Sequence, residues 1–365
     1  MLRLSFPMSP KEKMMENTPP KRILIVRLSA IGDVLMTSPV PRALKCAYPG
    51  VHIAWVVDKL SAPMVQGNPY VDDIIILDRK QWEKQMGQGK IVDVLRGLSA
   101  LKRRLRAGNY DMAIDMQELF ISGLVCWLSG ARRRIGPIPA REMNQIFMTE
   151  RVERPQVTTR LTDSCMGMLR GMGIDAPAES PVLVVPEADR QAAAQLLADA
   201  GLLDGRYVTC CISSSRPQKD WVASRWGELA DELWQRHGLR TVLVGGPERK
   251  EQAEKLVATH SPQLISAVGR TTLLQASAIC QGGVALVGVD TGLTYAGMAN
   301  GVPTVALYGS TVSTWLNEEP LVTVIHHKLP CYPCHRRPSC ANYDCMVAIT
   351  VEEVATAIEE LLNSG

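Results

Sequence analysis

An aspartate and a lysine in distant parts of the chain are the side chains best suited to a group-transfer reaction. Asp33 closes the stretch RILIVRLSAIGD, in which an apolar segment leads through a short loop to the start of a helix. Lys219 lies in the polar segment SSSRPQKDW, which follows a second apolar segment. A carboxylate can take a proton from an attacking hydroxyl, and a lysine can stabilise a departing phosphate. The alternatives are a helix-capping role for Asp33 and an ordinary polar loop around Lys219.

Other loops that follow apolar segments carry groups able to bind a nucleotide. Residues 213–215 are three serines close to Lys219, and hydroxyl donors beside a positive charge suit a diphosphate. Glu248 follows TVLVGG and could bind ribose hydroxyls, or could only complement a helix dipole. Residues 290–292, Asp-Thr-Gly, precede a helix whose first N–H groups would attract phosphate; an N-cap with a glycine turn is the alternative. The G-x-G-x-x-G dinucleotide motif is absent from the sequence.

Four of the ten cysteines gather near the C-terminus in the pattern C-x2-C-x5-C-x4-C, at Cys331, Cys334, Cys340 and Cys345. Close cysteines can hold zinc or an iron–sulfur cluster, but this spacing is not that of two C-x2-C knuckles. We therefore expect a structural thiol cluster and no bound metal. The other six cysteines are scattered, mostly in apolar surroundings, which is typical of reduced thiols in a cytoplasmic protein.

Short apolar strands alternate with helical stretches, and these elements must position the groups above. In the first half we expect strands at 22–27, 52–58, 73–78 and 110–116, and helices at 33–46, 92–106 and 118–128. In the second half we expect strands at 208–213, 241–246, 264–269, 284–290 and 303–309. Such alternation predicts parallel sheets with helices on both faces, and ligands bind beyond the carboxyl ends of their strands. We therefore predict two doubly wound α/β domains with a cleft between them.

A stretch rich in proline and charge at about residues 150–185 separates the two halves. We place a flexible lead-in at 1–20, a first domain at 21–175, a second domain at 185–348 and a last amphipathic helix at 350–365. The lead-in lacks the apolar core of a signal peptide, and no apolar run reaches the ~18 residues needed to span a bilayer. With 46% apolar and 21% charged residues, the chain is typical of soluble proteins, and we expect it in the cytoplasm.

The formal net charge of +3 conceals a basic first half and an acidic second half. Residues 1–170 hold 26 Lys and Arg against 16 Asp and Glu, and residues 171–365 hold 14 against 21. Basic clusters lie at 102–106 and 132–134. The imbalance suits an anionic acceptor or an acidic membrane surface, and two solvated faces are the alternative. Nucleic acid is not an expected partner, because the sequence shows no helix-turn-helix, zinc-finger or RNP motif.

Five segments, taken in order, carry a family resemblance. They are RLSAIGDVLMTSP (27–39), SSSRPQKDW with SRW behind it, GGPE (245–248), VGVDTGLTYAGMANGVPTVALYGST (287–311) and the CYPC…C…CM segment (331–346). Together they resemble the bacterial heptosyltransferases of lipopolysaccharide core synthesis, glycosyltransferase family 9. The resemblance implies the GT-B fold, two Rossmann-like domains that face a central cleft, with the last helix returning to the first domain. It also implies transfer of heptose from ADP-heptose, with inversion and without a metal.

The resemblance also implies roles for individual residues. Asp33 would be the catalytic base, and Lys219 would be the cation that holds the donor phosphates. The donor-binding positions would be Ser213, Ser214, Ser215, Glu248, Asp290, Thr291, Gly292 and Tyr295. We expect Ser29, Gly32, Arg132 and Arg133 to contact the acceptor, a lipid A–core oligosaccharide. The enzyme would use no cofactor and would touch the inner membrane peripherally from the cytoplasm.

Tyr295 departs from the family pattern D-[ST]-G-x-x-H, which usually carries histidine at this position. A phenol can donate a hydrogen bond but does not readily become charged near pH 7. The tyrosine could therefore change the rate or the donor preference. Two rival interpretations follow: an enzyme on the same scaffold, a GT-B glycosyltransferase or an epimerase, that acts on another nucleotide sugar, or a catalytically silent nucleotide-binding protein.

Overall fold

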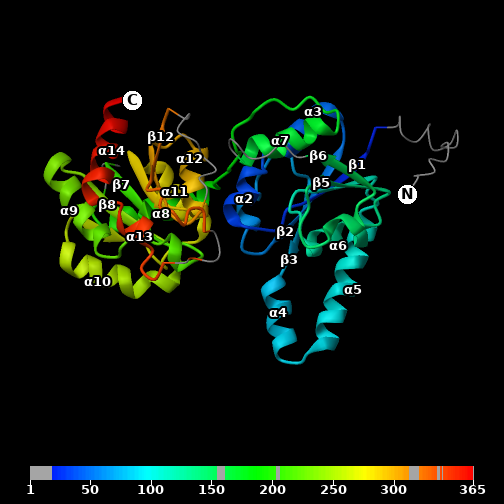
Figure 1. Ribbon diagram of the computed structural model, residues 1–365, viewed down its shortest axis with the longest axis horizontal. Helices are drawn as coiled ribbons and strands as arrows, with labels where there is room; N and C mark the ends of the chain where they lie inside the picture. Colours follow the sequence, from blue (N-terminus) through cyan, green and yellow to red (C-terminus); the bar gives the residue numbers. More distant parts are fainter. Residues whose placement is uncertain are drawn as a thin grey trace.

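The chain forms two layered units, which Figure 1 shows side by side. The computed structural model describes residues 19–153, 161–202, 206–311, 320–334, 338 and 340–364. The predicted lead-in at 1–20 lies outside the described residues, except for its last two. We refer to residues 19–171 as the first half and to residues 187–364 as the second half.

The first half alternates strands with helices. Its elements are β1 (Arg22–Val26), α2 (Ile31–Met36), α3 (Val40–Ala47), β2 (His52–Asp58), the 3₁₀ helix η1 (Ala62–Met64), β3 (Asp73–Leu77), α4 (Arg79–Gly87), α5 (Ile91–Ala107), β4 (Met112–Asp115), α6 (Phe120–Ser129), β5 (Arg133–Ile138), the 3₁₀ helix η2 (Asn144–Phe147), β6 (Glu150–Glu153) and α7 (Leu161–Gly171).

The second half repeats the alternation. Its elements are α8 (Glu187–Asp199), β7 (Tyr207–Cys211), η3 (Pro217–Lys219), α9 (Arg225–His237), β8 (Arg240–Val244), η4 (Pro247–Arg249), α10 (Lys250–His260), β9 (Leu264–Ser266), α11 (Leu273–Gly282), β10 (Ala285–Val289), α12 (Gly292–Ala299), β11 (Thr304–Tyr308), β12 (Val322–His326), α13 (Asp344–Val347) and α14 (Val351–Ser364).

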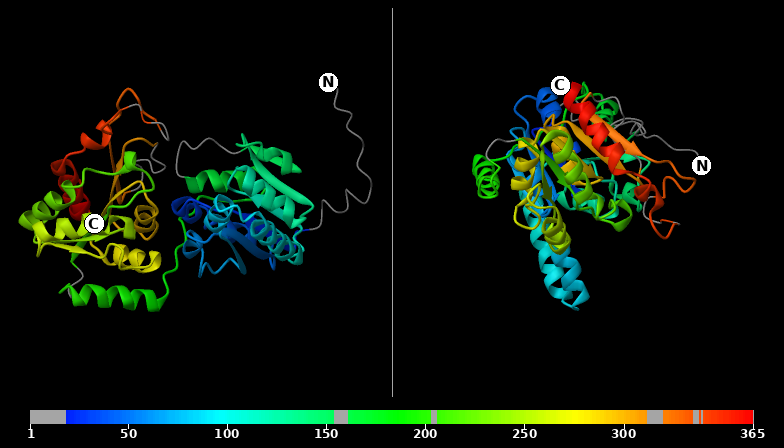
Figure 2. Two further views of the ribbon diagram at one scale, coloured as in Figure 1. Left: turned by 90° about the horizontal axis from the view of Figure 1, so that it is seen from below. Right: turned by 90° about the vertical axis from the view of Figure 1, so that its left-hand side faces the viewer.

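Each half is built on a parallel sheet of six strands. The strand orders are β3-β2-β1-β4-β5-β6 and β12-β11-β10-β7-β8-β9, and each sheet reverses its order beside its first strand. Helices cover both faces of the sheets, as the two directions of view in Figure 2 show. The prediction of two doubly wound α/β units is confirmed.

The sequence of β1 explains why both faces of the first sheet are covered. Successive side chains of a strand point to opposite faces. Ile23 and Ile25 belong to one buried apolar cluster, and Leu24 and Val26 belong to another. A strand that buries both faces is apolar along its buried length, which is why residues 23–26, ILIV, form a continuous apolar run after Arg22.

The helix predicted at 33–46 is two helices, because Pro39 interrupts it. α2 ends at Met36 and α3 begins at Val40, with Pro39 as the N-cap residue of α3. Proline has no N–H to donate and disfavours a helical conformation at the residue before it. The interruption leaves Asp33 in a helix of six residues directly after β1.

Helices α4 and α5 form a hairpin that extends away from the first sheet in Figure 1. We call residues 79–107 the α4–α5 hairpin. The sequence predicted α5 but not α4, because none of the α4 side chains is buried and the helix has no apolar stripe. Gly97 of α5 lets the indole of Trp82 pack closely, since a Cβ at Gly97 would lie 2.8 Å from Trp82 Nε1.

The two halves meet where α2 contacts α12. Here Ile31 packs so closely on Gly292 that a Cβ at this glycine would lie 2.4 Å from Ile31 Cγ2. One buried apolar cluster therefore contains residues of both halves, including Leu35 and Ala296. Because α2 follows β1 and α12 follows β10, the carboxyl ends of these two strands face each other across the contact.

The last helix, α14, belongs to the second half. It contacts α9, β10, β11 and β12, and its residues Val354, Ile358 and Leu361 lie in the apolar cluster of that half. The spacing of these three residues makes one apolar stripe, which the second sheet buries. The prediction that the last helix returns to the first domain is therefore wrong.

Candidate active site

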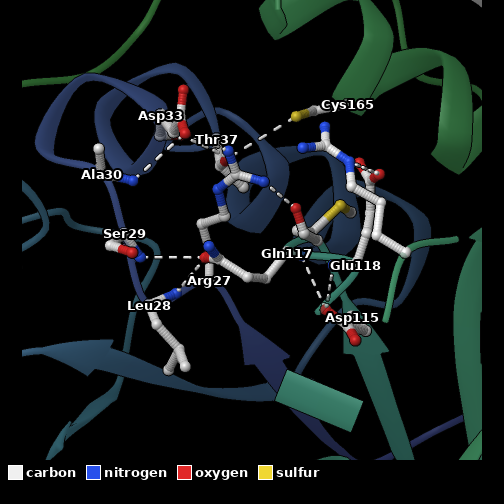
Figure 3. A network of polar contacts seen from close by, with 12 residues as sticks. Arg27, Leu28, Ser29, Ala30, Asp33, Thr37, Asp115, Gln117, Glu118 and Cys165 are labelled. Carbon is white, nitrogen blue, oxygen red and sulfur yellow. Dashed lines mark hydrogen bonds and ion pairs between the residues drawn. The ribbon is translucent and has the colours of Figure 1, made fainter. Parts of the chain in front are cut away.

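Asp33 lies at the carboxyl end of β1 with its side chain held but accessible (Figure 3). Its Oδ2 lies 2.9 Å from Arg27 Nη2 and accepts a hydrogen bond from the Ala30 N–H at 3.2 Å. The Asp33 side chain is 44% exposed, whereas Arg27 is buried. The carboxylate therefore has a fixed orientation and one face open to an incoming group. The helix-start position and a role as base are compatible.

A second group of polar residues holds the loop before Asp33. The side-chain oxygen Oε1 of Gln117 accepts hydrogen bonds from the N–H groups of Leu28 at 2.9 Å and Ser29 at 3.0 Å. The buried guanidinium of Arg27 donates to the carbonyl of Met116. Three hydrogen bonds with residues 116 and 117 thus fix the loop that carries Asp33.

Asp115, at the end of β4, in turn fixes residues 116–118. Its Oδ1 accepts hydrogen bonds from the N–H groups of Gln117 at 2.7 Å and Glu118 at 3.1 Å. Its Oδ2 accepts from Ser122 Oγ at 2.8 Å and Asn144 Nδ2 at 2.5 Å. Burial raises the pKa of this carboxyl to about 6, although these hydrogen bonds favour the charged form.

The raised pKa of Asp115 predicts a particular pH dependence of stability. Because the pKa is about 6 in the folded protein and 3.8 in the unfolded chain, the folded state binds the extra proton between these values. This proton binding contributes roughly 3 kcal/mol to the free energy of unfolding. The contribution is fully present below pH ~4 and is lost as pH rises through ~6. Urea unfolding at pH 4 to 7 should show this decrease relative to Asp115→Asn. A free-energy difference between the two proteins that is constant with pH would contradict the assignment.

On the second half, Lys219 and Asp290 form an ion pair between neighbouring loops. Lys219 Nζ lies 2.5 Å from Asp290 Oδ2, and both side chains are largely buried. Asp290 Oδ2 also accepts a hydrogen bond from Thr311 Oγ1 at 2.7 Å. The loops meet because β7 and β10, which precede them, are adjacent in the sheet. A carboxylate would repel a phosphate, and this ion pair orients the Lys219 ammonium group; a contact of Asp290 with the donor stays a prediction.

The other predicted donor-binding residues lie along the same carboxyl edge. Ser213 Oγ accepts a hydrogen bond from the Gly246 N–H at 2.9 Å, which ties the loops after β7 and β8 together. Ser214 Oγ contacts Asp220 Oδ1 at 2.6 Å, whereas Ser215 is exposed. Glu248 is also exposed, in η4 at the end of β8. The fold therefore brings these positions into one row of loops, and their contacts with a donor stay a prediction.

Tyr295 links the two halves and the two candidate catalytic residues. Its ring packs against Gly32, where a Cβ would lie 2.5 Å from Tyr295 Cδ2. Its hydroxyl donates to Asp290 Oδ1 at 3.1 Å and lies 2.7 Å from the Tyr308 hydroxyl. Through Asp290 this tyrosine reaches Lys219, and through Gly32 it touches the residue before Asp33. Tyr295, which replaces the histidine of the family pattern, is thus part of the contact between the halves.

Replacing Gly32 by alanine should disturb this contact. The added methyl group would overlap the buried Tyr295 ring, and overpacking of this kind costs about 1–3 kcal/mol. Displacement of α2 would also move Asp33, so we expect turnover to fall about 10- to 100-fold. Thermal unfolding and steady-state turnover of Gly32→Ala would measure both effects.

The double variant Gly32→Ala/Tyr295→Ala provides the steric test. If the clash with the ring is the cause, the methyl group should cost little stability once the ring is absent, so the double variant should lose less than the sum of the two single variants. Gly87→Ala is the matched control, because a Cβ at Gly87 meets nothing within 4 Å. Additive losses in the double variant would contradict the steric explanation.

The structure separates Arg132 and Arg133 from the site. Arg133 begins β5 and is paired in register with Met112, which is itself level with Ile23 near the start of β1. It therefore lies at the amino edge of the sheet, opposite the edge that carries Asp33. Its Nε and Nη2 lie 2.7 and 2.9 Å from the two carboxylate oxygens of Glu150 on β6. Arg133 is therefore remote from Asp33, and a contact of these arginines with an acceptor stays a prediction.

Ser29, by contrast, lies in the loop that carries Asp33. Its hydroxyl accepts a hydrogen bond from Arg79 Nη2 at 3.1 Å, and Arg79 also pairs with Asp58 at 2.6 Å. Arg79 begins α4, so the base of the α4–α5 hairpin touches this loop. A contact of Ser29 or Gly32 with an acceptor stays a prediction.

The C-terminal cysteines do not form a metal centre in the part of the chain that the structure describes. No group of three or more His, Cys, Asp or Glu side chains among those residues is arranged to hold a metal ion. Cys345 is buried, and Cys331, Cys334 and Cys340 are partly exposed. Burial raises the pKa of the Cys334 and Cys345 thiols, and charge on neighbouring cysteines raises both further. A raised pKa keeps these thiols protonated near neutral pH, so they are poor nucleophiles there.

The residues that hold Asp33 in place were not predicted from the sequence. Arg27 is the charged residue that directly follows the apolar run of β1, and a buried cation at a strand end signals a functional partner. Asp115 gave a similar signal inside the apolar strand YDMAIDM. Gln117 gave none, because its role depends on the adjacency of β1 and β4.

Comparisons with known proteins agree with this geometry. The family described as "Glycosyltransferase family 9 (heptosyltransferase)" matches residues 98–343. Lipopolysaccharide heptosyltransferase 1 of Pseudomonas aeruginosa is 26% identical over 326 residues, covering 87% of this chain and 86% of that protein. The crystal structure of a family 9 glycosyl transferase from Veillonella parvula has a TM-score of 0.79 at 26% identity, covering 94% of this chain and 98% of that chain.

A structure of the E. coli heptosyltransferase WaaC with ADP-2-deoxy-2-fluoro heptose shares the fold. Its TM-score is 0.72 at 23% identity, and the match covers 93% of this chain and 99% of that chain. The two parallel six-stranded sheets are those of the GT-B heptosyltransferase structures, so the predicted fold class is confirmed. Since the family match also extends over more than half of the sequence, this chain belongs to glycosyltransferase family 9, the heptosyltransferases.

Proposed function

We propose that this glycosyltransferase transfers heptose from ADP-heptose to a hydroxyl of the lipopolysaccharide inner core, with inversion at the anomeric carbon. The observation that carries the proposal is the pair of oppositely charged groups on facing halves, Asp33 and Lys219, linked through Tyr295. The choice of substrates is supported by the similarity to lipopolysaccharide heptosyltransferase 1 and to the E. coli enzyme with its ADP-heptose analogue.

In this mechanism Asp33 acts as the general base. A sugar hydroxyl is a weak nucleophile until its proton is removed in the transition state. The Asp33 carboxylate would take the proton as the hydroxyl oxygen forms its bond to the anomeric carbon on the face opposite the leaving group. The contacts with Arg27 and the Ala30 N–H leave one carboxylate oxygen, Oδ1, available for this step.

Lys219 would stabilise the leaving ADP. As the bond from the anomeric carbon to the phosphate oxygen breaks, the electron pair and the growing negative charge pass to the diphosphate. An ammonium group and the N–H groups at the start of α12 are suited to this charge. We therefore infer a reaction without a metal or cofactor, in which Asp290 holds Lys219 in place.

We place the reaction at the cytoplasmic face of the inner membrane, where a lipid-linked acceptor presents its sugars. The excess of Lys and Arg in residues 1–170 supports an acceptor that carries carboxylates and phosphates. None of the helices among the described residues is long and apolar enough to cross a bilayer.

The deciding experiment is an assay of ADP release by the purified protein. The protein would receive ADP-heptose with a panel of truncated lipopolysaccharide cores, and UDP- and GDP-sugars would serve as donor controls. Acceptor-dependent release with ADP-heptose alone is the expected result, and the panel then identifies the acceptor. Release with another nucleotide sugar would replace the proposed donor. Binding of ADP-heptose without release on any acceptor would favour a silent nucleotide-binding protein, and Tyr295 would be the first position to examine.

A further inference from the structure

The far end of the α4–α5 hairpin exposes large apolar side chains. Met86 is 64% exposed, Ile91 63%, Val92 60% and Leu95 59%. Only Leu101 and Leu105 of α5 are buried, and both lie in the half of the helix nearer the sheet. Large apolar side chains that are clustered on a protruding element, rather than scattered singly, mark a surface that binds a protein or a membrane.

The hairpin is also strongly basic. Residues 79–107 contain nine Lys and Arg against two Asp and Glu. An α-helix has 3.6 residues per turn, so residues eleven apart lie almost on the same line along its surface. Lys102 therefore lies in line with Ile91, and Arg103 with Val92, about 16 Å nearer the sheet. One side of α5 thus carries apolar groups at its far end and cations at its end nearer the sheet.

Two contacts make the hairpin a rigid extension of the site. Trp82 packs on Gly97 and holds α4 against α5. At the base, Arg79 donates to Ser29 in the loop that carries Asp33 and pairs with Asp58. An object bound by the far end of the hairpin would therefore lie at a fixed distance from Asp33.

We propose that the α4–α5 hairpin docks this enzyme on the surface of an anionic lipid bilayer. Met86, Ile91, Val92 and Leu95 enter the interface between headgroups and acyl chains, while Lys102 and Arg103 bind lipid phosphates. The inference rests on the proposed function, because it gives a lipid-embedded acceptor its route to Asp33. A second copy of the chain is a poor occupant, since two hairpins with this excess of positive charge would repel each other.

Flotation of the purified full-length protein with lipid vesicles tests the proposal directly. Vesicles of phosphatidylethanolamine and phosphatidylglycerol in a 3:1 ratio would be compared with vesicles of phosphatidylcholine. We expect binding to the anionic vesicles, at least tenfold weaker binding to the neutral ones, and a decrease as salt rises, because salt screens the charges.

Two variants separate the apolar and the charged contributions. Ile91→Ser/Leu95→Ser should weaken binding by at least tenfold, since two apolar groups no longer leave water. Lys102→Glu/Arg103→Glu should weaken it on the order of 100-fold, because two attractive charges become repulsive. The matched controls lie on exposed helices of the second half: Trp234→Ser on α9 and Lys250→Glu/Lys255→Glu on α10. Both controls should bind like the unmodified chain.

ADP release on a water-soluble core oligosaccharide keeps this test separate from the proposed function. Both hairpin variants should turn over the soluble acceptor normally, which also shows that they fold, and should lose turnover of the same sugar on a vesicle-embedded lipid. If neither the unmodified chain nor any variant released ADP, the proposed function would be overturned. The docking proposal would then be judged from vesicle binding alone. Vesicle binding unchanged in both hairpin variants would overturn the docking proposal. A second result would also overturn it: light scattering shows a dimer, Ile91→Ser/Leu95→Ser dissociates that dimer, and no protein binds the vesicles.

Discussion

Replacing Asp33 by asparagine should lower turnover by about 10²- to 10⁴-fold and leave ADP binding unchanged. Asparagine has the same shape, and its side-chain oxygen can still accept from the Ala30 N–H and contact Arg27. It cannot take a proton from the acceptor, so the loss should appear in kcat. Steady-state ADP release and calorimetric titration with ADP would measure the two quantities on the same protein.

Asp189→Asn is the matched control for this substitution. Asp189 lies in the first turn of α8, as Asp33 lies in the first turn of α2, but it belongs to the second half and accepts from Thr272 Oγ1. If the only role of Asp33 is a favourable interaction with the helix dipole, both variants should lose a similar small amount of stability and keep their turnover. Full turnover in Asp33→Asn would remove it from the role of base.

The substitution Lys219→Ala should impair both donor binding and rate. We expect KM for the donor to rise and kcat to fall by about 10²- to 10³-fold, because the ammonium stabilises charge that grows as ADP leaves. The variant should also be less stable, since it leaves the largely buried Asp290 carboxylate without its cation. Donor titration, turnover and thermal unfolding would be measured together.

The double variant Lys219→Ala/Asp290→Asn distinguishes catalysis from structure. The amide removes the unpaired charge. Its oxygen can still accept from the Tyr295 hydroxyl, and its NH2 group can donate to the Thr311 hydroxyl, so stability should return. Turnover should stay low, because no cation faces the phosphates. If turnover returned together with stability, Lys219 would be a structural residue, and the site would need another cation for the leaving group.

The strands near the site could be predicted from local sequence because both of their faces are buried. β2 lies at His52–Asp58, the residues expected, and β1 and β10 end within one residue of the prediction. A strand covered on both faces is apolar at nearly every position. It can therefore be recognised from its own sequence, without knowing which strands pair with it. The loops after these strands, with Asp33 and residues 290–292, could therefore be assigned to the carboxyl edges.

Elements that depend on distant contacts were not predictable in this way. Strand β6 has the sequence ERVE and lies at the edge of its sheet, so it needs no apolar run. Strand β5 contains Pro137 and begins with two arginines. Because β5 was not recognised, Arg133 could not be assigned to the amino edge, and its charge alone suggested an acceptor site. The contact of Tyr295 with Gly32 joins residues of separate halves and has no local signal.

The placement of α14 has a consequence for motion between the halves. The chain passes from one half to the other between α7 and α8, and α14 then stays with the second sheet. A single covalent connection allows rotation about the apolar contacts between the halves, where α2 meets α12 and η1 meets α11, and these contacts would act as a pivot. Asp33 and Lys219 lie close to this pivot through Tyr295, so a rotation would separate remote surfaces far more than these two residues. Substrates could then enter and products leave by a small opening movement that preserves the alignment of base and cation.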